Sequence, residues 1–176
     1  AFIFNNPLVN NEERKTVALL NIGASVSNLD ILEAGIPRLS RDMHIAGDTF
    51  THKIMDVFGI DFNNADKLKI NPESDPEKKN KINAAVESVL SNLAVEIRTS
   101  FDYYESQNAS SVAKIFLSGA GAKFSGLKDA LSRLLGIEVE YWDPLRRIQI
   151  NAGLGTEEVK AAAGQLAVAV GLALRS

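Results

Sequence analysis

The sequence predicts an α/β fold in which a three-stranded meander and further strands are packed by helices, one of them long. Glycine-bearing turns divide residues 16–43 into three short β-rich segments. Apolar residues spaced three or four apart continue from about residue 77 to residue 107, which indicates one long helix. Strand-like runs then alternate with helical patterns to the end of the chain. This order is typical of a layered α/β or α+β architecture.

The first three strands follow one another with short turns. Thr16–Ile22 is a nearly continuous apolar run, which is typical of a central strand, and Gly23–Ser25 forms the turn after it. Ser27–Glu33 is expected to pair back as a hairpin. Ile36–Met43 is expected to be the third strand, at a sheet edge because Pro37 cannot donate to a ladder.

Helices are predicted next. The spacing of apolar residues predicts a helix over Gly47–Phe58 that ends at Gly59, whose lack of a side chain suits a helix end. Asp61 is a suitable N-cap for a shorter helix that includes Lys69. The long helix follows over residues 77–107, and Tyr103 and Tyr104 are expected in or near the core.

The C-terminal third again mixes strands and helices. Val112–Leu117 is a buried type of strand, Ser125–Leu135 is a helix that ends before Gly136, and Ile137–Trp142 is a short alternating strand. Thr156 is expected to cap a final helix with acidic residues in its first turn.

Composition excludes several classes of site. The 176 residues include 19 Lys+Arg and 22 Asp+Glu, for a net charge of −3, and no cysteine. Disulfides, cysteine-bound zinc, iron–sulfur clusters and thiol catalysis are therefore excluded, and the mild acidity gives no case for nucleic acid as a partner. His44 and His52 are too few for a multi-histidine metal site. No apolar run reaches the ~18–20 residues of a membrane span. The chain opens on apolar residues without Met, so we expect a fragment of a longer protein.

Two glycine loops are candidate ligand sites. A turn such as Gly23, Ala24 and Ser25 at the end of a strand can cradle phosphate oxygens, although its spacing alone favours an ordinary hairpin turn. The loop Gly119, Ala120 and Gly121 lets a flat ligand pack against backbone, as a base or ribose does; the alternative is a strand-to-helix connection. It is neither a Walker A loop nor a dinucleotide fingerprint.

Asp66 and Lys69 form a third candidate, one turn apart on the predicted short helix. Such a pair can hydrogen-bond ribose hydroxyls and place an alkyl stem on a purine. The alternative is a solvated surface ion pair worth ~0–1 kcal/mol. The spacing of these two residues, taken alone, favours this alternative.

The succession of these segments resembles the second lobe of the actin/Hsp70-like ATPase superfamily, whose lobes have an actin-like or RNase H-like fold. Within it, the chain most resembles the PilM family of type IV pilus assembly proteins, relatives of the cell-division protein FtsA. The resemblance covers essentially the whole chain, and its most specific stretches are residues 96–104, 115–127 and 165–175.

The resemblance implies the following roles. Gly23, Ala24 and Ser25 match the second phosphate loop, and Gly119, Ala120 and Gly121 match the adenosine loop. Asp66 and Lys69 match the positions that approach ribose and adenine. ATP, with Mg²⁺ in the full-length protein, is the implied cofactor. No residue is predicted to be catalytic or a metal ligand, and hydrolysis is not expected, because Asn21 stands where the family usually has Asp.

The resemblance also implies the biological setting. The protein is expected to be cytoplasmic and peripheral to the inner membrane through its partners. There it is expected to bind the PilN cytoplasmic tail, through a first lobe absent here, and to help assemble the pilus platform. Residues of about 12–46 and 110–176 are expected to form the core of the second lobe, with a helical insertion over about 47–108. An FtsA-like membrane-associated filament protein and the C-terminal lobe of a sugar kinase remain the alternatives, and self-association stays open.

Overall fold

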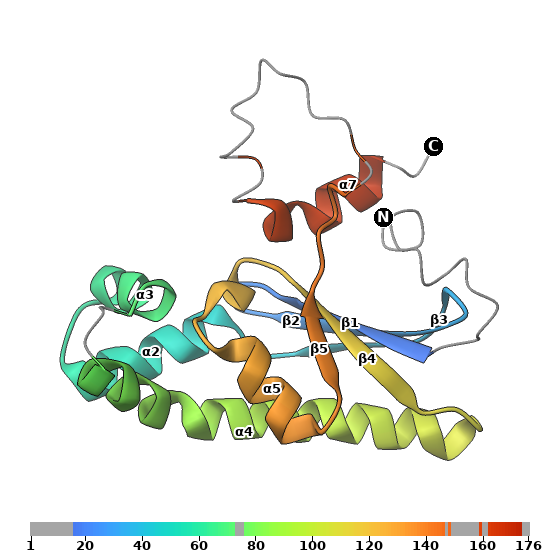
Figure 1. Ribbon diagram of the computed structural model, residues 1–176, viewed down its shortest axis with the longest axis horizontal. Helices are drawn as coiled ribbons and strands as arrows, with labels where there is room; N and C mark the ends of the chain where they lie inside the picture. Colours follow the sequence, from blue (N-terminus) through green and yellow to red (C-terminus); the bar gives the residue numbers. More distant parts are fainter. Residues whose placement is uncertain (1–15, 73–75, 147, 149–158, 160–161, 174–176) are drawn as a thin grey trace.

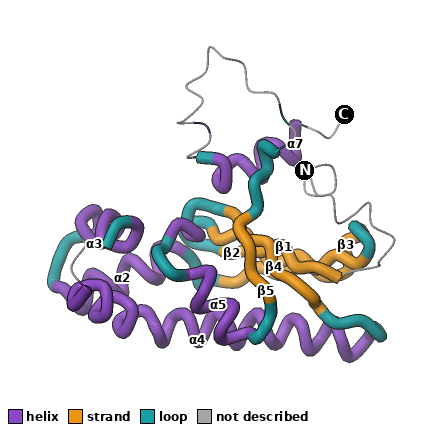
Figure 2. Tube along the Cα trace, in the orientation of Figure 1, coloured by secondary structure: helices purple, strands orange, loops and turns teal. Residues whose placement is uncertain are grey.

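One mixed sheet organises the molecule. The structure is a computed structural model that describes residues 16–72, 76–146, 148, 159 and 162–173. In these ranges five strands are hydrogen-bonded in the order β3-β2-β1-β4-β5, and helices gather around them (Figure 1 and Figure 2). The α/β fold expected from the sequence is therefore confirmed.

The meander forms half of the sheet. β1 (Thr16–Ile22), β2 (Ser27–Glu33) and β3 (Ile36–Met43) pair antiparallel, with the bounds that the turns predict. Most of β1 is buried on both faces, as a central strand requires. Most residues of β3 are exposed, and among the described strands it lies at the edge of the sheet, where a proline such as Pro37 is tolerated.

The other half of the sheet is parallel. β4 (Val112–Ser118) pairs with β1, and β5 (Glu138–Tyr141) pairs with β4. α5 (Leu127–Leu135) connects them and begins two residues later than predicted. The reason is Gly126, whose φ of 85° is left-handed and cannot lie inside an α-helix.

Three helices stand between β3 and β4 in the sequence: α2 (Gly47–Phe58), α3 (Phe62–Ile70) and α4 (Pro76–Gln107). Gly59 ends α2 with a φ of 63°, and its N–H donates to the Met55 carbonyl at 2.8 Å. Asp61 caps α3 by accepting a hydrogen bond from the Asn64 N–H at 3.0 Å. Both predicted helix signals are confirmed.

The core lies between one face of the sheet and these helices. α4 runs along the sheet, with α2 and α5 beside it (Figure 1). Inward-facing residues of β1 and β2, such as Leu20 and Leu29, join one hydrophobic cluster with Phe50 of α2 and Phe101 of α4. Tyr104 belongs to this cluster, but Tyr103 is 57% exposed. The expectation for Tyr103 was wrong because adjacent helical residues point about 100° apart.

The opposite face carries a smaller apolar group. Val17, Leu32 and Phe116 are buried there, with Leu19 and Trp142 packed against them. Two short helices, η3 (Ala163–Leu166) and α7 (Ala167–Ala173), lie on the opposite side of the sheet from α4 (Figure 1). The predicted cap Thr156 lies outside the described residues. No described helix combines the length and the apolar character that a bilayer span requires.

Candidate functional site

The two predicted glycine loops lie against each other. They follow β1 and β4, which are parallel neighbours, so both loops lie at the carboxyl ends of these strands, on the same end of the sheet. A Cβ atom on Gly121 would stand only 2.6 Å from the Gly23 carbonyl oxygen. The two loops therefore touch through their backbones, in a contact that only glycine at position 121 allows.

Gly119 explains how the second loop reaches this position. Its φ is +96°, and a Cβ there would lie 2.2 Å from the Ile22 carbonyl oxygen, at the end of β1. Its N–H donates to the Gly164 carbonyl at 2.8 Å, which joins the loop to η3. η2 (Gly121–Lys123) then continues the loop toward α5.

Gly47 is a third member of this contact that the sequence analysis did not single out. Its N–H donates to the Gly23 carbonyl at 3.0 Å, and the next N–H, of Asp48, donates to the Ala24 carbonyl at 2.8 Å. A Cβ on Gly47 would be 3.3 Å from the Gly121 Cα atom. The available signal was a glycine at the first position of a helix whose N-cap, Ala46, has no capping side chain.

Ser25 adds a side-chain contact between the turn and α2. Its hydroxyl donates to Asp48 Oδ2 at 3.0 Å, in an exposed position. The turn Gly23–Ser25 is thus held to the first turn of α2 by two backbone bonds and one side-chain bond. This arrangement gives a defined shape to a turn that the sequence alone could not distinguish from an ordinary hairpin.

Lys69 is buried, with 5% of its surface exposed, so the alternative of a solvated surface pair does not describe it. Its Nζ donates to Asp66 Oδ1 at 2.6 Å, to Thr51 Oγ1 at 2.8 Å and to the Gly47 carbonyl at 3.3 Å. The Asp66 side chain is 41% exposed. All three predicted segments therefore converge on the first turn of α2, around Gly47.

Asn21 lies beside the glycine turn in a row of polar side chains that crosses the sheet. The Ser118 hydroxyl donates to Asn21 Oδ1 at 3.3 Å, and Asn21 Nδ2 donates to Asn28 Oδ1 at 3.3 Å. Asn28 Nδ2 then donates to Asp42 Oδ1 at 2.7 Å. Both ends of the Asn21 amide are used, so here the amide links strands. Within the described ranges, no three His, Asp or Glu side chains are grouped to hold a metal ion.

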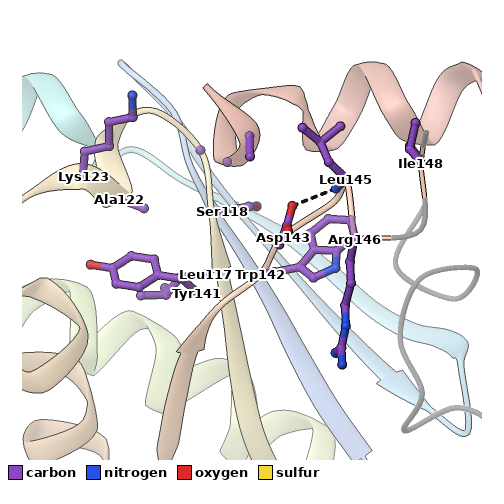
Figure 3. Close-up of a pocket in the computed structure, with 13 residues that line it drawn as sticks. Leu117, Ser118, Ala122, Lys123, Tyr141, Trp142, Asp143, Leu145, Arg146 and Ile148 are labelled. Carbon is purple, nitrogen blue, oxygen red and sulfur yellow. Dashed lines mark hydrogen bonds between the residues drawn. The ribbon is translucent and has the colours of Figure 1, made fainter. Parts of the chain in front are cut away.

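A cavity of about 580 Å³ adjoins the second loop at Gly119 (Figure 3). Its walls come from the ends of β4 and β5 and from η3, and they include Leu117, Trp142 and Gly164. The Leu145 N–H donates to Asp143 Oδ1 at 2.9 Å and shapes the chain after β5. Asp66 and Lys69 do not line this cavity, so it is adjacent to the convergence around Gly47 and distinct from it.

Comparisons with known proteins identify a family and similar structures. A family model described as type IV pilus assembly protein PilM matches residues 2–176. A solved structure of a PilM-PilN type IV pilus biogenesis complex matches with a TM-score of 0.82 and 27% identity, over 98% of this chain and 49% of that one. The chain thus spans about half the length of that relative.

More distant structures share the fold alone. The ethanolamine utilization protein EutJ from Carboxydothermus hydrogenoformans has 18% identity and a TM-score of 0.65, over 92% of this chain and 49% of that one. MreB5 of Spiroplasma citri, bound to ADP, has 12% identity and a TM-score of 0.64, over 92% of this chain and 53% of that one. The comparison with curated proteins found no match.

Proposed function

The chain belongs to the PilM family of type IV pilus assembly proteins, and we propose that within this role it forms a nucleotide-binding lobe of an actin-like protein. The observation that carries the proposal is the convergence of the two glycine loops and the Asp66/Lys69 pair around Gly47. Unrelated surface features have no reason to meet at one point, whereas the parts of one ligand site must. The MreB5 structure that shares this fold was bound to ADP.

The residues present fit an adenine nucleotide. Glycine at positions 23, 47 and 121 lets the backbones of the two loops and of the first turn of α2 pack directly against one another, which would bring these loops together around one ligand. Ser25 would add a hydroxyl toward phosphate oxygens. Asp66, with a partly exposed carboxylate, would accept hydrogen bonds from ribose hydroxyls. Bound ATP would supply phosphate charge and a ribose to these groups, and the output we propose is a change of conformation.

We propose the setting that the family implies. The complete protein would act at the cytoplasmic side of the inner membrane, where it would help assemble the platform of the pilus machinery through PilN. The solved relative is a PilM-PilN complex, which supports a PilN-like partner. The family match gives no observation in favour of a filament protein of the FtsA type or of a sugar kinase.

Calorimetric titration of ATP into the complete protein tests the proposed site. Asp66→Asn removes one carboxylate charge and keeps the shape, so we expect it to weaken ATP binding on the order of tenfold, as for a hydrogen bond to a charged group. Asp56→Asn is the matched control, because Asp56 is an exposed acid on α2, and its affinity should stay within about twofold of wild type. Equal affinity of all three proteins for ATP, or no binding of ATP by wild type, would contradict the proposed site.

A further inference from the structure

Lys69 is a buried cation that joins three parts of the candidate site. Its side chain reaches α2 through Thr51 and the Gly47 carbonyl, and it pairs with Asp66 on its own helix. Its backbone carbonyl accepts from the Ser125 N–H at 3.4 Å, just beyond η2. One residue therefore holds α3 both to the first turn of α2 and to the segment that follows the second glycine loop.

Counting donors shows how the ammonium group is used. A lysine ammonium has three N–H donors, and Nζ has three acceptors: Asp66 Oδ1, Thr51 Oγ1 and the Gly47 carbonyl. All three donors are used inside the protein, and the side chain is only 6% exposed. To contact a ligand, the ammonium would have to give up a bond that compensates a buried charge.

We propose that Lys69 is a positioning residue, which orients Asp66 toward a nucleotide ribose and does not itself contact the nucleotide. This inference rests on the proposed function. In the described part of the chain, the hydrogen bonds to the Asp66 carboxylate from Lys69 and Thr51 both end on Oδ1. They fix the side chain and leave Oδ2 with its capacity to accept hydrogen bonds from a ligand.

The same contacts connect Asp66 to the first glycine turn. Lys69 Nζ binds the Gly47 carbonyl, and the Gly47 N–H binds the Gly23 carbonyl. Together with the bond from Lys69 to Asp66, three hydrogen bonds thereby set the distance between the acidic side chain and the turn proposed for phosphate. Lys69 thus determines the position of the Asp66 carboxylate relative to the turn. This position must be fixed if Asp66 is to bind the ribose hydroxyls of a nucleotide whose phosphates lie at the turn.

The test compares ATP with 2′,3′-dideoxy-ATP, which lacks both ribose hydroxyls, by calorimetry on the complete protein. We expect wild type to prefer ATP on the order of tenfold. Lys69→Met and Asp66→Asn should each reduce this preference to within about twofold of equality, and the double variant should lose no more than the worse single one. Affinity for the dideoxy nucleotide should stay near the wild-type value. Lys67→Met, an exposed lysine on the same helix, should behave as wild type.

Other results overturn the proposal. Equal loss of affinity for both nucleotides in Lys69→Met would indicate direct contact with base or phosphate, and additive losses in the double variant would separate Lys69 from Asp66. Wild type that binds both nucleotides equally would overturn this inference alone, whereas wild type that binds neither would overturn the proposed function. If Lys69→Met fails to fold, Thr51→Val replaces it, because it keeps the cation and removes one bond to Asp66. It should also reduce the preference for ATP.

Discussion

Asn21 shows how one side chain can join neighbouring strands of the sheet. Its amide accepts from Ser118 on β4 and donates to Asn28 on β2, and Asn28 donates to Asp42 on β3. Each residue in the row has a fixed direction of donation. A carboxylate at position 21 would replace the donor that Asn28 Oδ1 requires with an acceptor.

Asn21→Asp is therefore expected to destabilise the fold by about 1 kcal/mol, the typical net value of a lost hydrogen bond. In a protein of this size that corresponds to a fall in Tm of about 2–4 °C, which thermal unfolding measures. Asp42→Asn should restore stability to the Asn21→Asp variant. The Asn28 amide can then flip, so that it donates to position 21 and accepts from position 42. An unchanged Tm in Asn21→Asp, or a Tm that the second substitution does not restore, would contradict the hydrogen-bond directions assigned to this row of side chains.

The same pair of variants gives a fair test of hydrolysis. If the missing acid limits ATP hydrolysis, the Asn21→Asp substitution should raise the rate. The double variant Asn21→Asp with Asp42→Asn separates this chemical effect from loss of stability. A rate that stays at the wild-type value in the well-folded double variant would show that position 21 is not what limits hydrolysis.

At the scale of elements, the contact of β1, β4 and α2 depends on backbone approaching backbone. A Cβ on Gly121 would meet the Gly23 carbonyl at 2.6 Å and Ile22 Cγ2 at 2.7 Å. We expect Gly121→Ala to cost about 3 kcal/mol, the upper end of the usual range for overpacking, as measured by urea unfolding. Gly59→Ala is the control, because Gly59 has a φ of +63° and a Cβ there would meet nothing within 4 Å. This substitution should lower stability only through the strain of a left-handed backbone, by about 1 kcal/mol. An equal or smaller effect at Gly121 would contradict the close contact.

β4 and β5 are also joined by an ion cluster. Lys114 Nζ lies 2.8 Å from Glu140 and 3.1 Å from Glu138. The hydrogen bond from Lys114 lowers the pKa of Glu140. Burial acts to lower the pKa of Lys114, but the hydrogen bonds to Glu140 and Glu138 and the negative charges of these two groups together outweigh burial and raise the pKa. Charge on both partners is therefore favoured in the folded state.

These shifts predict a dependence of stability on pH. Because the folded pKa of Glu140 is depressed, its contribution is present above the unfolded value of 4.5 and is lost as the pH falls through the folded pKa. Glu140→Gln should lower stability at pH 7 by about 0.5 kcal/mol or less, since the Glu140 side chain is 48% exposed. The difference from wild type should shrink toward pH 3 in thermal unfolding. A difference that grows with acid would have the wrong sign.

Much of each element could be predicted from local chemistry. The Gly59 and Asp61 signals were sufficient to end one helix and begin the next, because both act within a turn of their own position. The start of α5 was predicted two residues too early, at Ser125, because Gly126 takes a left-handed φ that only the fold reveals. Gly47 was missed because its partners, Gly23 and Gly121, are remote in sequence.

The interpretation of Lys69 depended on information of the same kind. Its spacing from Asp66 indicates a pair on one helix face, which was correct. The sequence gives no indication that Thr51 and the Gly47 carbonyl lie within reach of Nζ, because α2 and α3 meet only after the chain reverses. Burial converts a surface pair into an internal link. This burial depends on how α2 and α3 pack, so it cannot be predicted from the residues near Lys69 in the sequence.

At the scale of the whole molecule, the chain spans about half of the PilM-PilN relative. We predict that the complete protein binds a labelled peptide of the PilN cytoplasmic tail, and that residues 1–176 alone do not, because the resemblance implies a PilN site in a first lobe outside these residues. Fluorescence anisotropy measures both affinities, with circular dichroism to verify that the shorter chain is folded. Equal affinity in the two proteins would place the peptide site within this chain.

The parallel pairing of β1 with β4 has a consequence for synthesis of the protein. β1, β2 and β3 are contiguous and can form a hairpin meander as soon as they leave the ribosome, but β4 follows only after α2, α3 and α4. Until then β1, which becomes the centre of the sheet, remains an open edge. Closure of such a long loop makes this pairing a slow, late step. The nascent chain is therefore most exposed to aggregation, and most dependent on chaperones, before residue 118 has emerged.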